Sequence, residues 1–171
     1  ETLEGLLRRA EEADSIERLE DLKGRLREVG LRLPRERLER APMQKGGPRI
    51  FQSADGLDIL VGRSDKGNRR LTFTIARGND YWLHVRGWPG PHVVLRKPPA
   101  GELPQESLLD AAHLAVHFSK IRDADYAEVD YTQCKYVRQL KGAAPGKVGL
   151  ARASTFQVRI EPDRLRRLLE G

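Results

Sequence analysis

The stretch NDYWLHVRGWPGPHVVLR, residues 79–96, predicts a β-hairpin with a stiff turn. Residues 81–86 alternate between two sets of side chains, and a period of two is typical of a strand. The Trp-Pro-Gly-Pro run at 88–91 predicts the turn, and the apolar residues 93–95 predict the returning strand. One face of the first strand then carries Trp82, His84 and Arg86.

The segments around this hairpin predict an α+β fold. Residues 50–61, with Asp55-Gly56 in the middle, predict a second hairpin, and a polar loop follows at 64–68. Residues 69–76 fit either a strand or a short helix. Several strands around a single long helix indicate a largely antiparallel sheet with one long helix and a C-terminal helix. Downstream of the hairpin the pattern predicts a helix over 104–120, a strand over 126–132, a glycine-rich basic loop, strands over 148–153 and 155–160, and a last helix from residue 161.

The first 48 residues differ from the rest in pattern. Over 1–33, apolar residues recur at helical spacing in two series, and Asp14 with Glu17 resembles a capping box. Such amphipathic helices need a partner surface, which is a missing part of a longer protein, the following domain or each other. The predicted organisation is a helical segment over 1–33, a basic linker over 34–48 that is punctuated by Pro and Gly, and one domain over 49–171.

The chain has 171 residues and a formal net charge of +6, which is unevenly distributed. Residues 1–33 carry a net charge of −2, whereas residues 81–101 and 131–152 contain bases and no acidic residue. Acid-free basic stretches suit a polyanion-binding face, because neutralised phosphates release counterions. The alternative is an ordinary solvated basic surface. The bases of the second stretch are Lys135, Arg138, Lys141, Lys147 and Arg152.

Cysteine content and hydropathy indicate the compartment. Cys134 is the only cysteine, which excludes an internal disulfide and fits a reducing compartment such as the cytosol. No stretch approaches the ~18 consecutive apolar residues that a membrane span needs. The expected protein is cytoplasmic and makes no contact with a membrane.

Two pairs of residues could form a catalytic or a metal site, and the sequence supports neither well. Cys134 with His92 is the only nucleophile–base pair, and no strand-to-helix elbow or oxyanion turn accompanies it. His113 and His117 are four residues apart on the predicted helix, but no third metal ligand is evident. A hydrolase or metal enzyme therefore stays a minor alternative. We expect no catalytic residue, no metal site and no cofactor.

Three segments together resemble a known family: FQSADGLDILVGRSDKGN (51–68), DYWLHVRGWPGPHVVLR (80–96) and VDYTQCKYVRQLKGAAPGKVGL (129–150). They resemble the NFACT-R domain, the C-terminal RNA-binding module of NFACT proteins, and residues 1–33 resemble the end of the coiled-coil region that precedes it. Three positions depart from the family pattern. Ser64 replaces an asparagine, Arg69 replaces the aspartate of an Asn-Asp pair, and Pro91 replaces the serine of a PGSHV motif.

The resemblance implies a part in bacterial ribosome quality control. NFACT proteins of this kind bind the large ribosomal subunit that holds a stalled peptidyl-tRNA, and they recruit tRNA for alanine tailing of the nascent chain. The ribosome makes the bonds, so the resemblance implies a binding module and no enzyme. Some family members are known as fibronectin-binding proteins, so an adhesion module that binds host matrix protein is the alternative.

The candidate RNA contacts come from three places. An exposed strand end can stack on bases and hold phosphate, and a tip tryptophan serves as a stacking platform unless it packs on its own hairpin. Trp82 itself is expected in the core. Basic residues in glycine-rich loops suit phosphate contacts. The candidates are His84, Arg86, Trp88 and His92 around the turn, Arg63 and Lys66 in the earlier loop, and Lys135, Arg138, Lys141 and Lys147 in the basic segment.

Overall fold

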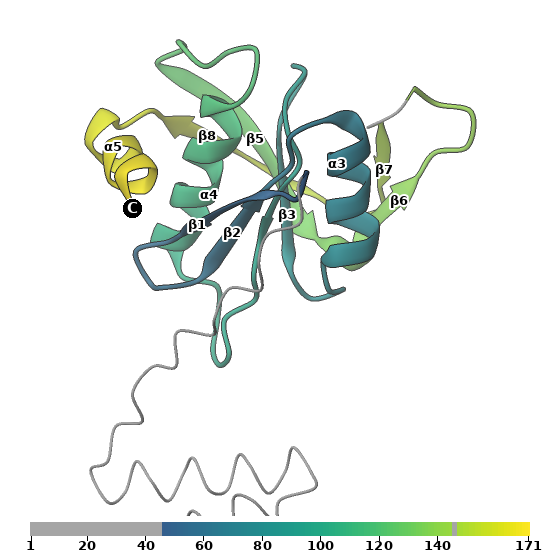
Figure 1. Ribbon diagram of the computed structural model, residues 1–171, viewed down its shortest axis with the longest axis horizontal. Coiled ribbons are helices and arrows are strands. Elements are labelled where there is room, and N and C mark those ends of the chain that lie inside the picture. Colours follow the sequence, from purple (N-terminus) through teal and green to yellow (C-terminus); the bar gives the residue numbers. More distant parts are fainter. Residues whose placement is uncertain (1–45, 145–146) are drawn as a thin grey trace, which may run out of the picture. The chain divides into compact units, whose positions relative to one another are not determined.

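The computed structural model describes residues 46–144 and 147–171 (Figure 1). The predicted helices of 1–33 and most of the predicted linker lie outside the described residues. The described part forms a six-stranded and a two-stranded sheet, and every strand pair is antiparallel. In spatial order the larger sheet contains β1 (Arg49–Gln52), β2 (Asp58–Val61), β4 (Val93–Leu95), β3 (Tyr81–Val85), β5 (Tyr126–Gln133) and β8 (Ser154–Arg159), and the smaller sheet contains β6 (Val137–Gln139) and β7 (Val148–Leu150).

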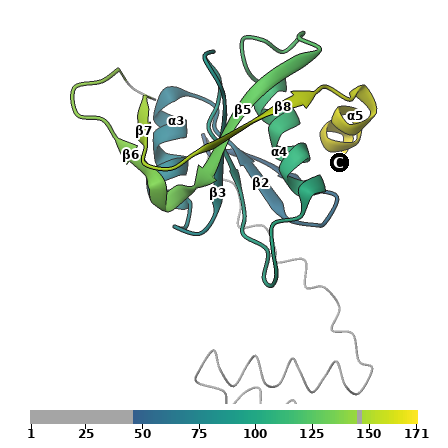
Figure 2. The ribbon, with the colours of Figure 1, turned by 180° about the vertical axis from the view of Figure 1, so that it is seen from behind.

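Secondary-structure elements cover both faces of the larger sheet (Figures 1 and 2). The predicted α+β class, with a long helix and a C-terminal helix, is confirmed. Among the described residues, no helix has the length and apolarity that a membrane crossing requires. On one face lie α4 (Gln105–His117) and α5 (Pro162–Glu170); on the other lie α3 (Asp65–Arg70), its continuation as the π-helix η1 (Leu71–Ile75), and the β6–β7 hairpin, which the 3-10 turn η2 (Cys134–Tyr136) joins to β5.

The alternation along β3 divides its side chains between two cores. Leu83 and Val85 pack with the apolar side of α4, whereas Trp82 packs with Leu60 and Val94 beneath η1 and β6. Trp82 is 3% exposed, so the prediction that it lies in the core is confirmed. Because both faces of the sheet are covered, Trp82, Leu83 and Val85 of β3 are buried, and only Tyr81 and His84 are partly exposed.

The prediction of a polar loop at residues 64–68 is wrong, because α3 begins there. The Oγ of Ser64 accepts a hydrogen bond from the backbone N of Gly67 at 3.0 Å, and Asp65 places a carboxylate in the first turn. Residues 69–76, which fit either strand or helix, continue this helix into η1. The apolar residue that anchors it, Leu71, comes after the polar start, so a short window at 64–68 contains only polar residues and glycine.

The predicted glycine-rich loop after β5 is partly a hairpin. β6 pairs with β7, with Val137 opposite Leu150, and the strand predicted over 148–153 ends at Leu150. β6 has three residues, which is too short for alternation to reveal it.

Candidate nucleic-acid interface

The turn between β3 and β4 presents Trp88 to solvent. Trp88 is 54% exposed. The turn is docked on the end of α4: the backbone N of Lys120 donates to the carbonyl of Pro89 at 3.0 Å, and a Cβ added at Gly90 would lie 2.9 Å from the Cβ of Ser119. Only glycine allows this close approach, so Trp88 is held on a tightly packed support.

Three aromatic rings pack beside this turn. The Trp82 and His84 rings stack with centroids 5.8 Å apart, and His92 packs edge-on at 5.3 Å from Trp82 and 5.9 Å from His84. Burial lowers the pKa of His84, although hydrogen bonds with the backbone of Gly90 and Val85 act in the opposite direction. His84 is therefore neutral at pH 7, and it can contact RNA by stacking or hydrogen bonding but not through an ion pair.

His92, predicted as an RNA contact, lies in the interior and is 1% exposed. Its Nδ1 is 2.7 Å from the Oγ1 of Thr72 in η1, and its backbone N donates to the Oδ1 of Asn68 in α3 at 3.1 Å. These bonds join β4 to the helical layer. His92 thus positions α3 relative to the turn, and its own ring does not form part of the surface.

Arg86, directly after β3, is exposed but held in place. Its guanidinium donates to the Oγ1 of Thr155 in β8 at 3.1 Å, and that hydroxyl in turn donates to Asp130 in β5. The chain Arg86–Thr155–Asp130 crosses three neighbouring strands. Sequence patterns gave no signal for this contact, because the partners are 69 residues apart.

The β6–β7 hairpin carries the predicted basic cluster. Arg138, Lys141 and Lys147 are exposed, and within the described residues none of them has an acidic partner. At the base of the hairpin, the Nζ of Lys135 and the guanidinium of Arg152 lie 5.3 Å and 5.4 Å from the centroid of the Tyr136 ring. The hairpin is joined to α3 through Arg69, which donates to the side chain of Gln139 at 3.1 Å.

Arg63 lines an open cleft of about 590 Å³, and Lys66 on α3 does not. The cleft lies between the β2–α3 loop, the Pro89–Pro91 turn and the segment after α4. Three of its bases were not predicted, because they come from separate segments and each segment has an ordinary composition. Among the described residues, the cleft bases are Arg49, Arg63, Lys120 and Arg122, and Asp65 is the only acid that lines it.

Cys134 does not fit the role of a nucleophile. It is buried, and burial together with the nearby Asp80 carboxylate raises the pKa of its thiol to about 12, although Arg96 acts in the opposite direction. The thiol is therefore protonated at neutral pH. This argues against the Cys134–His92 pair as catalytic chemistry.

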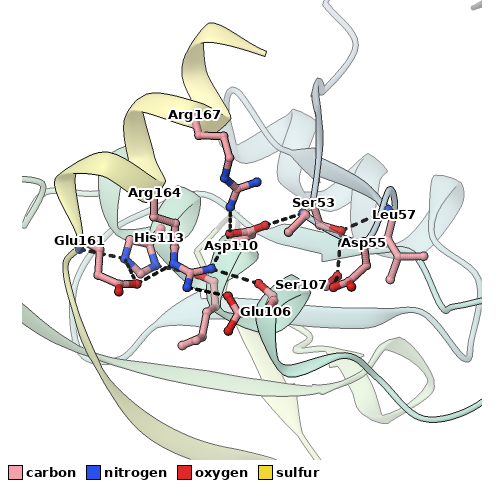
Figure 3. Close-up of polar contacts among 12 residues, drawn as sticks. Ser53, Asp55, Leu57, Glu106, Ser107, Asp110, His113, Glu161, Arg164 and Arg167 are labelled. Atoms are coloured by element: carbon pink, nitrogen blue, oxygen red, sulfur yellow. Dashed lines mark hydrogen bonds and ion pairs between the residues drawn. The ribbon is translucent and has the colours of Figure 1, made fainter.

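His113, one of the two histidines considered as metal ligands, uses both ring nitrogens in hydrogen bonds within the fold. Its Nδ1 bonds to the carbonyl of Leu109 at 2.7 Å, and its Nε2 accepts from the backbone N of Glu161 at 3.0 Å (Figure 3). Burial lowers the pKa of His113, so its 3.8 Å approach to the Glu161 carboxylate is no ion pair at neutral pH. A metal ion at His113 would have to displace one of these bonds.

A buried carboxylate fastens α5 to α4. Figure 3 shows Arg164 and Arg167 of α5 pointing towards Asp110 of α4. Their guanidinium groups lie 2.8 Å and 2.6 Å from its Oδ1, and the backbone N of Ala54 donates to its Oδ2 at 2.8 Å. Arg164 also pairs with Glu106 and Glu161. This network neutralises Arg164 and Arg167 of α5 within the fold.

Known proteins are similar to this chain in sequence and in fold. A family model described as the NFACT protein RNA binding domain matches residues 48–151. The Rqc2 homolog RqcH of Bacillus subtilis is 40% identical over 98 residues, which are 57% of this chain and 17% of that protein. The Rqc2 homolog RqcH of Streptococcus suis is 31% identical over 155 residues, which are 89% of this chain and 27% of that protein.

A solved structure agrees with these matches. The C-terminal part of the fibronectin/fibrinogen-binding protein of Streptococcus suis matches with a TM-score of 0.66 and 29% identity, over 86% of this chain and 58% of that chain. The chain spans 27% or less of the length of the two RqcH relatives. The likeness of the three quoted motifs to the NFACT-R domain is confirmed, and this chain belongs to the family of NFACT RNA-binding domains.

Proposed function

We propose that this chain binds tRNA and the ribosomal RNA of the large subunit through the basic side that carries the β6–β7 hairpin and α3. Membership of an RNA-binding family supports the class of ligand. The observation that carries the choice of surface is that Arg138, Lys141 and Lys147 are exposed and lack acidic partners among the described residues. The proposed contacts are these three bases with Lys135, Arg63, Lys66, Arg86, Trp88 and the neutral ring of His84.

The physical basis of the proposal is electrostatic. Bases without internal partners neutralise phosphates and release counterions, which favours binding to RNA of any sequence. Trp88 adds a stacking platform at the tip of the β3–β4 turn, where it is 54% exposed. His92 contributes indirectly, because it holds β4 against η1 and α3.

In the cell we propose that residues 49–171 act as one module of a ribosome quality-control factor in the cytoplasm. The similarity to RqcH proteins supports this setting. The module would engage the large subunit that carries a stalled peptidyl-tRNA and assist tRNA recruitment for alanine tailing. The ribosome would make the bonds, so the module needs no catalytic residue of its own.

Co-sedimentation of the 171-residue chain with large ribosomal subunits tests this function. Subunits with and without peptidyl-tRNA are compared across a salt series. We expect salt-sensitive binding that peptidyl-tRNA strengthens. The loss variant is Arg138→Glu/Lys141→Glu, and the matched control is Arg159→Glu/Arg166→Glu, which makes the same charge change beside α5. Absence of binding at low salt, or equal loss in both variants, contradicts the proposal.

The name of the solved Streptococcus suis relative favours one second candidate function, binding of fibronectin or fibrinogen. Immobilised fibronectin probed with this chain at physiological salt tests it directly. Saturable binding that survives the Arg138→Glu/Lys141→Glu change would support adhesion through a surface other than the basic hairpin. No saturable binding rules it out for this chain.

A further inference from the structure

The cleft beside the β3–β4 turn has the properties of an anion site. Three segments that are far apart in the sequence meet there: the start of β1, the β2–α3 loop, and the residues that follow α4. Its volume of about 590 Å³ exceeds what a single phosphate fills and can admit a nucleotide-sized group. Four cationic side chains and one carboxylate line it, namely Arg49, Arg63, Lys120 and Arg122 with Asp65.

The walls of the cleft are held by close backbone packing. A Cβ added at Gly62 would lie 1.9 Å from the Oδ1 of Asn68, and one added at Gly90 would lie 2.9 Å from the Cβ of Ser119. The backbone N of Gly62 also donates to the carbonyl of His92 at 3.0 Å. A cleft whose walls are fixed in this way loses little conformational entropy when it binds a ligand.

The charges of the cleft remain available for a ligand. Within the described part of the chain, Arg63, Lys120 and Arg122 have no acidic partner. Arg49 lies over the ring of Phe118, 4.6 Å from its centroid, which orients the guanidinium without neutralising it. The positive charge of the cleft also affects the neighbouring His117. Burial lowers the pKa of His117, and the charges of Arg122 and Arg49 lower it further.

We propose that this cleft binds a phosphate group of an unpaired RNA segment, either within its backbone or at its end. Guanidinium groups match the geometry of phosphate oxygens, and several bases around one concave site favour a phosphate over a single carboxylate. Trp88 directly precedes the Pro89 that lines the cleft, so a base next to the bound phosphate can stack on it. The inference rests on the proposed RNA-binding function and adds a defined subsite to it.

Calorimetric titration of the 171-residue chain with uridine trinucleotides tests the subsite. One trinucleotide carries a 5′-phosphate and the other a 5′-hydroxyl, so the two arms separate a terminal from a backbone phosphate. The cleft variant is Lys120→Ala/Arg122→Ala, and the matched control is Arg159→Ala/Arg166→Ala beside α5. All four side chains are exposed, and melting temperatures confirm that both variants fold.

We expect the cleft variant to weaken trinucleotide binding by at least about tenfold, because charged hydrogen bonds are lost, and the control to leave it nearly unchanged. A stronger effect with the 5′-phosphate assigns the site to an RNA end, and an equal effect assigns it to the backbone. Bound trinucleotide should also raise the pKa of His117, measured by NMR, because it neutralises Arg49 and Arg122.

Two results overturn the inference. If neither trinucleotide binds, or if the cleft variant binds as the unchanged chain does, the cleft is not a phosphate site. In that case, ribosomal-subunit binding that still depends on the hairpin bases leaves the proposed function intact. If the cleft variant keeps its trinucleotide binding and the hairpin variant keeps its ribosomal-subunit binding, both the subsite and the proposed function are contradicted.

Discussion

Two groups of basic residues in this chain have opposite surroundings. On the α4–α5 side, Arg164 and Arg167 both bond to Asp110, whose side chain is 0% exposed (Figure 3). On the hairpin side, Arg138 and Lys141 are exposed and have no acidic partner among the described residues. The first group is neutralised inside the fold and fastens a helix. The second group keeps its charge for a ligand, so the partners of a base, rather than its presence, indicate its role.

The largest expected effect comes from removing the acid that neutralises the first group. Asp110→Ala leaves two guanidinium groups and the Ala54 amide without their shared acceptor. We expect a loss of about 3 kcal/mol in the free energy of unfolding, measured by urea denaturation. RNA affinity should be unchanged at temperatures where the variant is folded. A loss below about 1 kcal/mol would show that water replaces the network and that the two groups of bases differ less than the geometry indicates.

The next effect concerns the exposed tip on the other side. Trp88→Ala should weaken RNA binding by about 1–3 kcal/mol if a base stacks on the ring. Because Trp88 is 54% exposed, the melting temperature should hardly change. Fluorescence anisotropy with a short single-stranded RNA measures the first quantity and thermal denaturation the second. A lower melting temperature with unchanged affinity would make Trp88 a packing residue of its own hairpin.

Acidification should also act on the α4–α5 side. Burial lowers the pKa of His113 in the folded chain, so the unfolded chain takes up its proton first as the pH falls below about 6.5. The stability that neutral His113 provides is present above that pH and is lost as the pH falls towards the lowered pKa. The loss is at most about 1.4 kcal/mol per pH unit for one site.

His84 and His117 titrate in the same direction, since burial lowers the pKa of each. A His113→Asn variant separates the contribution of His113 to the acid-induced loss of stability from those of His84 and His117. Urea denaturation at pH 7 and pH 5 should show that this variant is less stable at pH 7 and loses less stability on acidification than the unchanged chain. An equal acid loss in both proteins would remove His113 from the account.

The smallest effect is expected at an exposed pair on α5. Arg166 lies 3.5 Å from Asp163, and both side chains are largely in solvent. Arg166→Ala should change the free energy of unfolding by less than about 0.5 kcal/mol. Denaturation of this variant beside Asp110→Ala then measures how much burial, rather than pairing alone, contributes to the network. A change as large as that of Asp110→Ala would refute the distinction.

The sequence predicted the parts of the fold that local patterns encode. The β3–β4 hairpin and the burial of Trp82 follow from alternation and from an apolar run, and both are confirmed. The polar start of α3 resembles a loop, because the residues between its cap at Ser64 and its buried Leu71 are all polar or glycine. β7 lies within the strand predicted over 148–153, but β6 was missed because a three-residue strand carries too little pattern.

The candidate site was predictable only where its residues are neighbours in sequence. The basic run from Lys135 to Lys147 was visible as an acid-free stretch. The cleft was not, since Arg49, Arg63 and Arg122 meet only after the sheet has formed. His92 illustrates the reverse error: a histidine beside a turn resembles a surface contact, but its bond to Thr72 is buried.

The central claim is that the exposed bases of the hairpin bind phosphate and that exposed bases on the α5 side do not. Its most direct test is the salt dependence of affinity for a single-stranded RNA, measured for the unchanged chain, Arg138→Glu/Lys141→Glu and Arg159→Glu/Arg166→Glu. We predict that the slope of log affinity against log salt falls by about 1.5 units in the hairpin variant, and that the control keeps its slope. Equal slopes in the two variants would contradict the claim, because net charge alone would then explain the binding.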